Sequence, residues 1–282
     1  MTPLIDPAKS KTKTQVWVVE NGTKRLRQDQ LTTEEPLEIR LTSPSRTVAI
    51  TMRTPGADFE LAAGFLFSEG VINSKQDIHR MSYCTDESID GEQRYNIINV
   101  QLQPGLNPNL QPLERHFYIN SACGVCGKAS IEALRLRGYA KITSDLAVKS
   151  EVIYSLSDQL RSHQGIFSAT GGLHAAAVFD AEGKIGNLQE DVGRHNALDK
   201  LIGNALLSGD LPFNRHIVMV SGRSSFEILQ KSVVAGIPLV CSVSAPSSLA
   251  VSVAEEFGIT LVGFLRENRF NVYTGWQRII TA

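Results

Sequence analysis

Alternating hydrophobic and polar residues mark the first third of the chain as predominantly β. A helix is predicted to begin at Asp58, as its N-cap, and to continue to Gly70, because apolar side chains recur there at helical spacing. The stretch 104–112, rich in Gly, Pro and Asn, predicts a loop. Strand patterns occur at 15–19, 37–41, 47–52 and 95–102. The pattern indicates a mainly β lobe with one helix.

The second half of the chain alternates helices with strands. A short helix at 157–164 and a glycine-bearing loop at 168–172 precede a β-hairpin over 173–190. Three helix–strand units follow, with helices at 194–207, 226–234 and 249–257 and strands at 216–220, 239–243 and 260–264. One further strand fits 270–273. This order predicts an α/β (α+β) fold, in which helices cover the faces of a mixed sheet.

The pattern of predicted elements changes near the middle of the chain, from mainly strands to alternating helices and strands. This change predicts how the chain is divided. We expect a flexible N-terminus over 1–14 and a mainly β N-terminal lobe over 15–120. A Cys-x-x-Cys loop with the helix after it occupies 121–150, and the mixed-sheet domain occupies 151–282. Within the third segment, the helix is expected at 130–137.

The amino-acid composition argues against nucleic acid and membranes as partners. Apolar residues make up 42% and charged residues 20%, and the net charge is −1, so no overall field attracts nucleic acid or an anionic membrane. No apolar run approaches the ~18 residues of a membrane span, and the first residues lack the apolar core of a signal peptide. We therefore expect a cytoplasmic protein without nucleic-acid or membrane partners.

The strongest chemical signal is a pair of cysteines, Cys123 and Cys126, flanked by glycines and followed by Lys128. A nearby lysine and a helix start lower the pKa of a thiol, and the thiolate is the species that attacks sulfur. Half of a zinc site, a thioredoxin-like dithiol and two structural thiols are alternative interpretations, although a second Cys-x-x-Cys is missing. Cys84 and Cys241 show no comparable context, and Cys241 lies in an apolar run.

The sequence resembles the FdhD family, the formate dehydrogenase accessory proteins that carry sulfur during molybdenum-cofactor maturation. The resemblance runs in fixed order over roughly 34–275 and includes Cys123-Gly-Val-Cys-Gly-Lys and Thr170-Gly-Gly-Leu-His-Ala-Ala. Its other segments are 34–40, 54–70, 190–200, 221–223, 244–250 and 262–275. Such motif coverage implies the family's function and its fold, with a C-terminal domain like that of cytidine deaminases. The zinc signature of those deaminases is absent, so no metal site is predicted.

The resemblance implies a persulfide relay. A cysteine desulfurase would supply sulfur to Cys123, with Cys126 as the partner cysteine. The acceptor would be the molybdenum or tungsten bis(molybdopterin guanine dinucleotide) cofactor, whose client enzyme is formate dehydrogenase; a guanine nucleotide would mimic it. A homodimer could engage one nucleotide arm per protomer. The alternative is a chaperone that binds the cofactor without a sulfur relay.

Candidate cofactor-binding residues cluster at predicted strand ends and helix starts. The resemblance places cofactor contacts on Phe264, Leu265, Arg266, Glu267, Asn268 and Arg269. Arginine guanidinium groups bind phosphates well. The same sequence is also compatible with a solvent-exposed basic turn. The turn of Ser221, Gly222 and Arg223 also suits a phosphate, or is an ordinary strand–helix turn. Arg194 and His195 gather at another helix start, whereas a structural role is favoured for His174.

Overall fold

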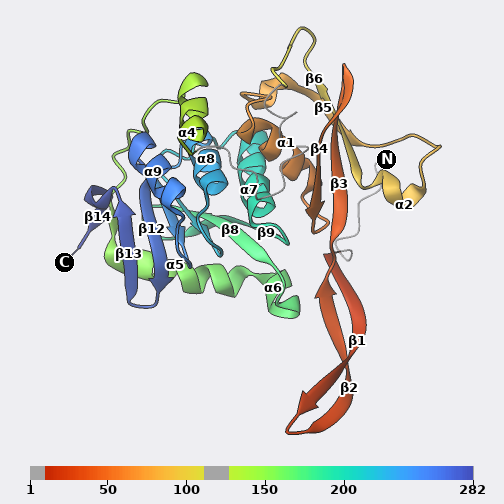
Figure 1. Ribbon diagram of the computed structural model, residues 1–282, viewed down its shortest axis with the longest axis horizontal. Coiled ribbons are helices and arrows are strands. Elements are labelled where there is room, and N and C mark those ends of the chain that lie inside the picture. The colour runs from red at the N-terminus through yellow and green to blue at the C-terminus, as the bar shows by residue number, and fades with distance from the viewer. Residues whose placement is uncertain (1–9, 111–126, 282) are drawn as a thin grey trace.

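The computed structural model describes residues 10–110 and 127–281. Two sheets with their covering helices form the body of the molecule, and a long hairpin projects from it (Figure 1). No helix in these ranges is both long and apolar enough to cross a lipid bilayer.

The projecting arm consists of β1 (Lys11–Glu20) and β2 (Thr23–Thr32), paired antiparallel over their full length. Asn21 and Gly22 connect them, both with positive φ, as a two-residue hairpin turn requires. Residues 11–14, expected to belong to a flexible N-terminus, are therefore part of a strand. The polar sequence of β2 gave no strand signal, because hardly any of its side chains are buried.

The N-terminal lobe is built on a four-stranded sheet with the order β4-β3-β6-β5. Helix α1 (Asp58–Ser68) buries Leu61 and Leu66 against the sheet residues Leu37 and Ile39. The remaining elements are β3 (Glu35–Thr42), β4 (Ser45–Arg53), η2 (Lys75–Asp77), β5 (Ile78–Tyr83), α2 (Gly91–Arg94) and β6 (Ile97–Leu102). The predicted mainly β character of this region is thus observed, with β5 as a strand that the sequence pattern did not reveal.

The start of α1 differs from the prediction. The N-cap is Ala57, with φ 54°, and Asp58 is the first helical residue. The Asp58 carboxylate does not cap the helix, because Arg53 donates to both of its oxygens at 3.1 Å. Both side chains are buried, so a buried ion pair with a residue five positions earlier decided the role of this acidic residue.

The C-terminal lobe is built on a six-stranded mixed sheet with the order β13-β12-β11-β10-β8-β9. Strands β10, β11 and β12 are parallel, and the others pair antiparallel. The strands are β8 (His174–Phe179), β9 (Ile185–Asp191), β10 (Ile217–Val220), β11 (Leu239–Ser242), β12 (Thr260–Arg266) and β13 (Arg269–Thr274). The helices are α4 (Gly127–Leu136), α5 (Ser150–His163), α6 (Gly165–Thr170), α7 (Arg194–Ser208), α8 (Phe226–Val234) and α9 (Ser248–Phe257). Short pieces β7 (Val148–Lys149), η4 (Trp276–Arg278) and β14 (Ile279–Ile280) complete the lobe.

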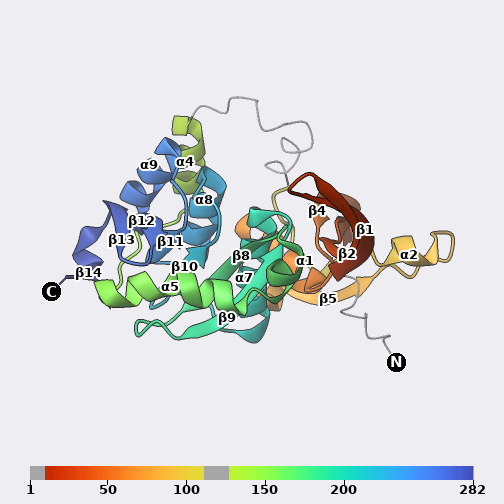
Figure 2. The same ribbon diagram turned by 90° about the horizontal axis from the view of Figure 1, so that it is seen from below.

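Helices cover both faces of this sheet, which confirms the predicted mixed α/β class. One core layer lies under α7, α8 and α9 and includes Leu201, Val218 and Val253. The opposite layer joins α5 to the sheet through Ile153 and Leu156, and α5 runs across that face in Figure 2. Helix α5 begins seven residues before the prediction, at Ser150. The segment 165–170, partly expected as a glycine loop, is the helix α6.

The two lobes are joined through α1 and α7, which pack side by side in Figures 1 and 2. Lys231 lies 2.9 Å from Asp199, and Ser68 of α1 donates to the same carboxylate at 2.9 Å. Lys200 pairs with Asp191 at 2.7 Å and donates to the carbonyl of Thr54. Both ion pairs lie within the C-terminal lobe, and the N-terminal lobe contributes the Ser68 hydroxyl and the Thr54 carbonyl to them. These hydrogen bonds fix the two lobes against each other, because separating the lobes would leave buried charged groups with unpaired bonding capacity.

Candidate functional site

A cavity of about 650 Å³ lies at the carboxyl edge of the six-stranded sheet. Its lining includes Ser221, directly after β10, and Leu265, Arg266 and Glu267 at the end of β12 and in the turn that follows. Ligands bind at this edge in α/β sheets because the loops after parallel strands gather there. Its volume falls within the range of small-molecule sites. Four of the predicted cofactor-binding residues are thus brought together.

The end of β12, before the turn to β13, has an unusual backbone. Phe264 adopts φ 53°, in the left-handed region that bulky side chains rarely occupy, and the strand pairing shifts register between Gly263 and Arg266. Leu265 is fully buried in the core below α5, whereas Phe264 and Arg266 face outward. Arg266 donates to the carbonyl oxygens of Val243 and Leu265 at 2.7 and 2.9 Å. The end of β12 therefore fixes a guanidinium in the lining of the cavity.

The other predicted residues lie beside the cavity rather than in its lining. A Cβ on Gly222 would stand 3.3 Å from Nδ1 of His174 and 3.5 Å from the Arg194 side chain. His174 lines the cavity, although sequence reasoning favoured a purely structural role for it. Its pKa is lowered by burial first and then by the nearby Arg194 guanidinium and His195 ring. A neutral imidazole at this place can donate one hydrogen bond from one ring nitrogen and accept another at the other.

His195 is turned toward the start of α8. Its Nε2 atom lies 3.1 Å from Oγ of Ser225 and 3.2 Å from Oε2 of Glu227. The hydrogen bond from His195 lowers the pKa of Glu227 to about 2. A nucleophile relay requires the acid and the hydroxyl on different ring nitrogens, so this trio does not activate Ser225. Arg223, also predicted to bind the cofactor, does not line the cavity either.

The wall formed by α5 and α6 was missed by sequence reasoning. It contributes Asp158, Arg161, Gln164 and Phe167 to the cavity lining. The carboxylate of Glu190 accepts from the backbone N–H groups of Ile166 and Phe167 at 2.9 and 2.8 Å, which holds the start of α6. The helix predicted at 157–164 contains Asp158, Arg161 and Gln164, but nothing in its pattern marked these residues as lining a site, and the glycine-bearing stretch after Phe167 was interpreted as a loop.

The predicted persulfide cysteines, Cys123 and Cys126, lie outside the described residues. The segment that carries them is flanked by Leu110, which packs on the core of the N-terminal lobe, and by α4, which begins at Gly127. Leu134 of α4 is buried in the core of the C-terminal lobe. The ends of the cysteine-bearing segment are thus attached to different lobes.

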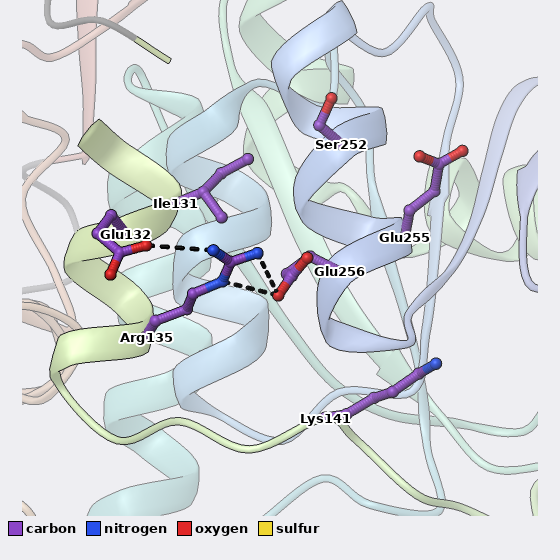
Figure 3. A pocket seen from close by; sticks show the side chains of 7 residues that line it. All are labelled: Ile131, Glu132, Arg135, Lys141, Ser252, Glu255 and Glu256. Carbon is purple, nitrogen blue, oxygen red and sulfur yellow. Dashed lines mark hydrogen bonds and ion pairs between the residues drawn. The ribbon is translucent and has the colours of Figure 1, made fainter. Parts of the chain in front are cut away.

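Helix α4 is also tied to α9 by charged groups. Arg135 donates to Glu256 at 2.8 Å and to Glu132 at 3.1 Å (Figure 3). Residues of both helices line an open groove of about 900 Å³, and Lys141 and Glu255 belong to the same lining. The pair Arg135–Glu256 is half exposed, so it contributes modestly to stability.

The remaining cysteines are buried. Cys84 and Cys241 are both free thiols, and burial raises the pKa of Cys241. Since the thiolate is the reactive form, Cys241 is inert in the folded protein. Within residues 10–110 and 127–281, no group of three or more His, Cys, Asp or Glu side chains is placed to hold a metal ion.

Comparisons with known proteins agree with this arrangement. The model of the FdhD/NarQ family matches residues 32–280. The "Sulfur carrier protein FdhD" of Streptomyces coelicolor is 50% identical over 93% of both chains. The protein of the same name from Sulfurisphaera tokodaii is 44% identical over 94% of this chain and 97% of its own.

A solved structure shares the fold. The crystal structure of a putative formate dehydrogenase accessory protein from Desulfotalea psychrophila superposes with a TM-score of 0.74 and 25% identity, covering 96% of this chain and 99% of that one. The predicted resemblance is therefore confirmed. The chain belongs to the FdhD/NarQ family.

Proposed function

We propose that this protein is a sulfur carrier for the maturation of formate dehydrogenase, which it serves by moving sulfur as a persulfide on Cys123. The names of its relatives support the sulfur-carrier role, and the accessory protein of the same fold supports the link to formate dehydrogenase. The acceptor is the molybdenum or tungsten bis(molybdopterin guanine dinucleotide) cofactor, bound as a client.

The cavity at the sheet edge is the observation that carries the binding half of this proposal. A nucleotide arm of the cofactor needs cations for its phosphates and a flat slot for its base. Arg266 offers a guanidinium, and Arg161 and Phe167 line the same cavity. Two arms per cofactor fit a two-fold homodimer, in which each protomer takes one arm.

The transfer half requires a balanced exchange of sulfur. The Cys123 thiolate attacks the terminal sulfur of a desulfurase persulfide; a new S–S bond forms, and the donor cysteine leaves as its thiolate. Delivery of the terminal sulfur as sulfide needs two electrons. Attack of the Cys126 thiolate on the Cys123 Sγ supplies them and leaves a Cys123–Cys126 disulfide, which an external thiol then reduces. The proposed steps need reduced thiols, which the cytoplasm maintains, and this supports a cytoplasmic location as part of the proposal.

Intact-mass spectrometry tests the uptake of sulfur. The protein is incubated with a cysteine desulfurase and cysteine, with Cys123→Ala as the variant and Cys84→Ala as the matched control. The wild type and the control are expected to gain about 32 Da per persulfide, reversibly with dithiothreitol; Cys123→Ala is expected to gain nothing. An active, matched desulfurase that leaves the wild type unchanged would overturn the relay.

The chaperone alternative is separated by a second readout on the same variant. GDP binding and restoration of formate dehydrogenase activity are measured in parallel for Cys123→Ala. A relay keeps GDP binding and loses restoration, whereas a chaperone keeps both.

A further inference from the structure

The groove between α4 and α9 lies at the opposite end of the six-stranded sheet from the cavity. Helix α9 starts after β11, at the carboxyl edge of the parallel strands, and runs back to Phe257, just before β12 begins at Thr260. Its residues Ser252, Glu255 and Glu256 line the groove, and the last two stand in the final turn of the helix. A partner seated on the groove and a ligand in the cavity therefore occupy different ends of the sheet.

Helix α4, which forms the other wall of the groove, directly follows the cysteine-bearing segment in the chain. Its first residue, Gly127, is the neighbour of Cys126. An extended chain spans at most about 3.6 Å per residue, so the Cα atom of Cys123 is tethered within roughly 15 Å of the start of α4. Ile131 and Arg135, which line the groove, stand about 6 and 12 Å along the helix from that point. A protein interface covers about 800 Å² on each partner, roughly 30 Å across, so a sulfur donor seated over the start of α4 also covers the groove.

The surface on this side of α4 and α9 is apolar and acidic. Leu136 of α4 is 80% exposed. The groove lining holds three carboxylates against two cations, and Arg135 is already engaged with two of these carboxylates (Figure 3). The third, Glu255, has no hydrogen bond or ion pair with any residue in the part of the chain that the structure describes. The groove therefore repels a polyanion such as the cofactor and attracts a cationic side chain of a protein partner.

We propose that the α4–α9 groove, with Leu136 on the same helix, is the docking surface for the sulfur donor, a cysteine desulfurase that presents a basic and apolar patch. This inference rests on the proposed function, in which Cys123 takes sulfur from such an enzyme. Glu255 pairs with a Lys or Arg of the donor and steers its approach, and Leu136 is buried against an apolar part of the donor. Sulfur uptake then proceeds while the cofactor occupies the other end of the sheet.

The kinetics of sulfur loading with a purified desulfurase test this docking surface. The persulfide on the peptide that carries Cys123 is measured by mass spectrometry over a series of carrier concentrations for the wild type, Glu255→Lys and Leu136→Ala. Both replaced side chains are exposed, so the fold is retained. The carrier concentration at half-maximal rate is expected to rise about 5- to 10-fold in each variant, with the maximal rate unchanged. At about 1 M salt, which screens exposed charges, the rise is expected to shrink for Glu255→Lys and to persist for Leu136→Ala.

Two controls separate docking from general charge effects and from thiol chemistry. Glu182→Lys makes the same charge change in the exposed turn between β8 and β9, where the next residue, Gly183, lies against α5 on the other face of the sheet. It is expected to load like the wild type. Inorganic polysulfide, a donor too small to need the groove, is expected to load Cys123 equally in the wild type and in all three variants.

The outcomes distinguish the docking surface from the proposed function. Wild-type kinetics in Glu255→Lys or in Leu136→Ala would overturn the docking surface, and so would an equal loss in Glu182→Lys or with polysulfide. A wild type that is loaded by polysulfide but not by an active desulfurase would overturn the desulfurase as donor and the docking surface with it. A wild type that takes no sulfur on Cys123 from either donor would overturn the proposed function as a whole.

Discussion

The crossing of α1 and α7 depends on two glycines, and replacing one of them gives a direct test of how the lobes are joined. A Cβ on Gly203 would stand 1.8 Å from the carbonyl oxygen of Glu60, and a Cβ on Gly64 would stand 1.9 Å from the carbonyl oxygen of Asp199. Both obstacles are backbone atoms of the facing helix, so no side chain can rotate away. Gly203→Ala therefore forces the helices apart.

The size of the effect follows from this geometry. Ordinary Cβ contacts begin at 3.4 Å, so the helices must separate by 3.4 − 1.8 = 1.6 Å at Gly203. A gap of 0.5–1 Å already forfeits a quarter to a half of each dispersion contact, and overpacking costs roughly 1–3 kcal/mol. Since backbone blocks backbone here, the upper end applies. Alanine is more favourable than glycine in a helix by about 1 kcal/mol. The net decrease in the free energy of unfolding is therefore about 2 kcal/mol.

Thermal unfolding measures this loss. For a chain of 282 residues, with an unfolding entropy of about 2.1 cal/mol/K per residue, about 2 kcal/mol corresponds to a fall in Tm of roughly 3–4 °C. Gly91→Ala is the matched control, because Gly91 begins α2 and a Cβ there meets nothing within 4 Å. A Gly203→Ala protein whose Tm equals that of the wild type, or exceeds it, would show that the lobes are not packed helix against helix as described.

Three further predictions concern buried or paired groups. Arg53→Met is expected to cost about 3–5 kcal/mol in urea unfolding, because it leaves the buried carboxylate of Asp58 without its bidentate partner; a loss below 1 kcal/mol would contradict this. In an NMR titration, Glu227 is expected to stay charged below its ordinary pKa of 4.5, down to about 2, and His195→Ala is expected to raise that pKa; equal values would refute the pairing. Iodoacetamide is expected to leave Cys241 unmodified in the folded protein and to label it after unfolding, as read by peptide mass spectrometry; labelling of the folded protein would contradict its burial.

The sequence by itself determined the elements whose apolar spacing is local. Helix α1, the β8–β9 hairpin and the three helix–strand units from α7 to β12 were predicted close to their observed bounds, because each buries one regular face. The ordered motifs likewise gave the family. The same reasoning could not detect β2, whose residues are almost all exposed and so carry no alternation. Strand order within the two sheets also lay beyond it, since pairing partners are distant in sequence.

The candidate site shows the same division. The strand–helix turn at Ser221 was recognisable locally, whereas Leu265, Arg266 and Glu267 were implied by the family resemblance; the structure places all four in the cavity lining. Sequence reasoning missed the α5–α6 wall, since α6 is held by Glu190 from a neighbouring strand. It also predicted Asp58 as the N-cap of α1, whereas the Asp58 carboxylate accepts hydrogen bonds from Arg53 instead. Local patterns specify which face of an element is buried; contacts between distant residues decide which polar groups remain free to bind a ligand, because only folding shows which of them have already found partners.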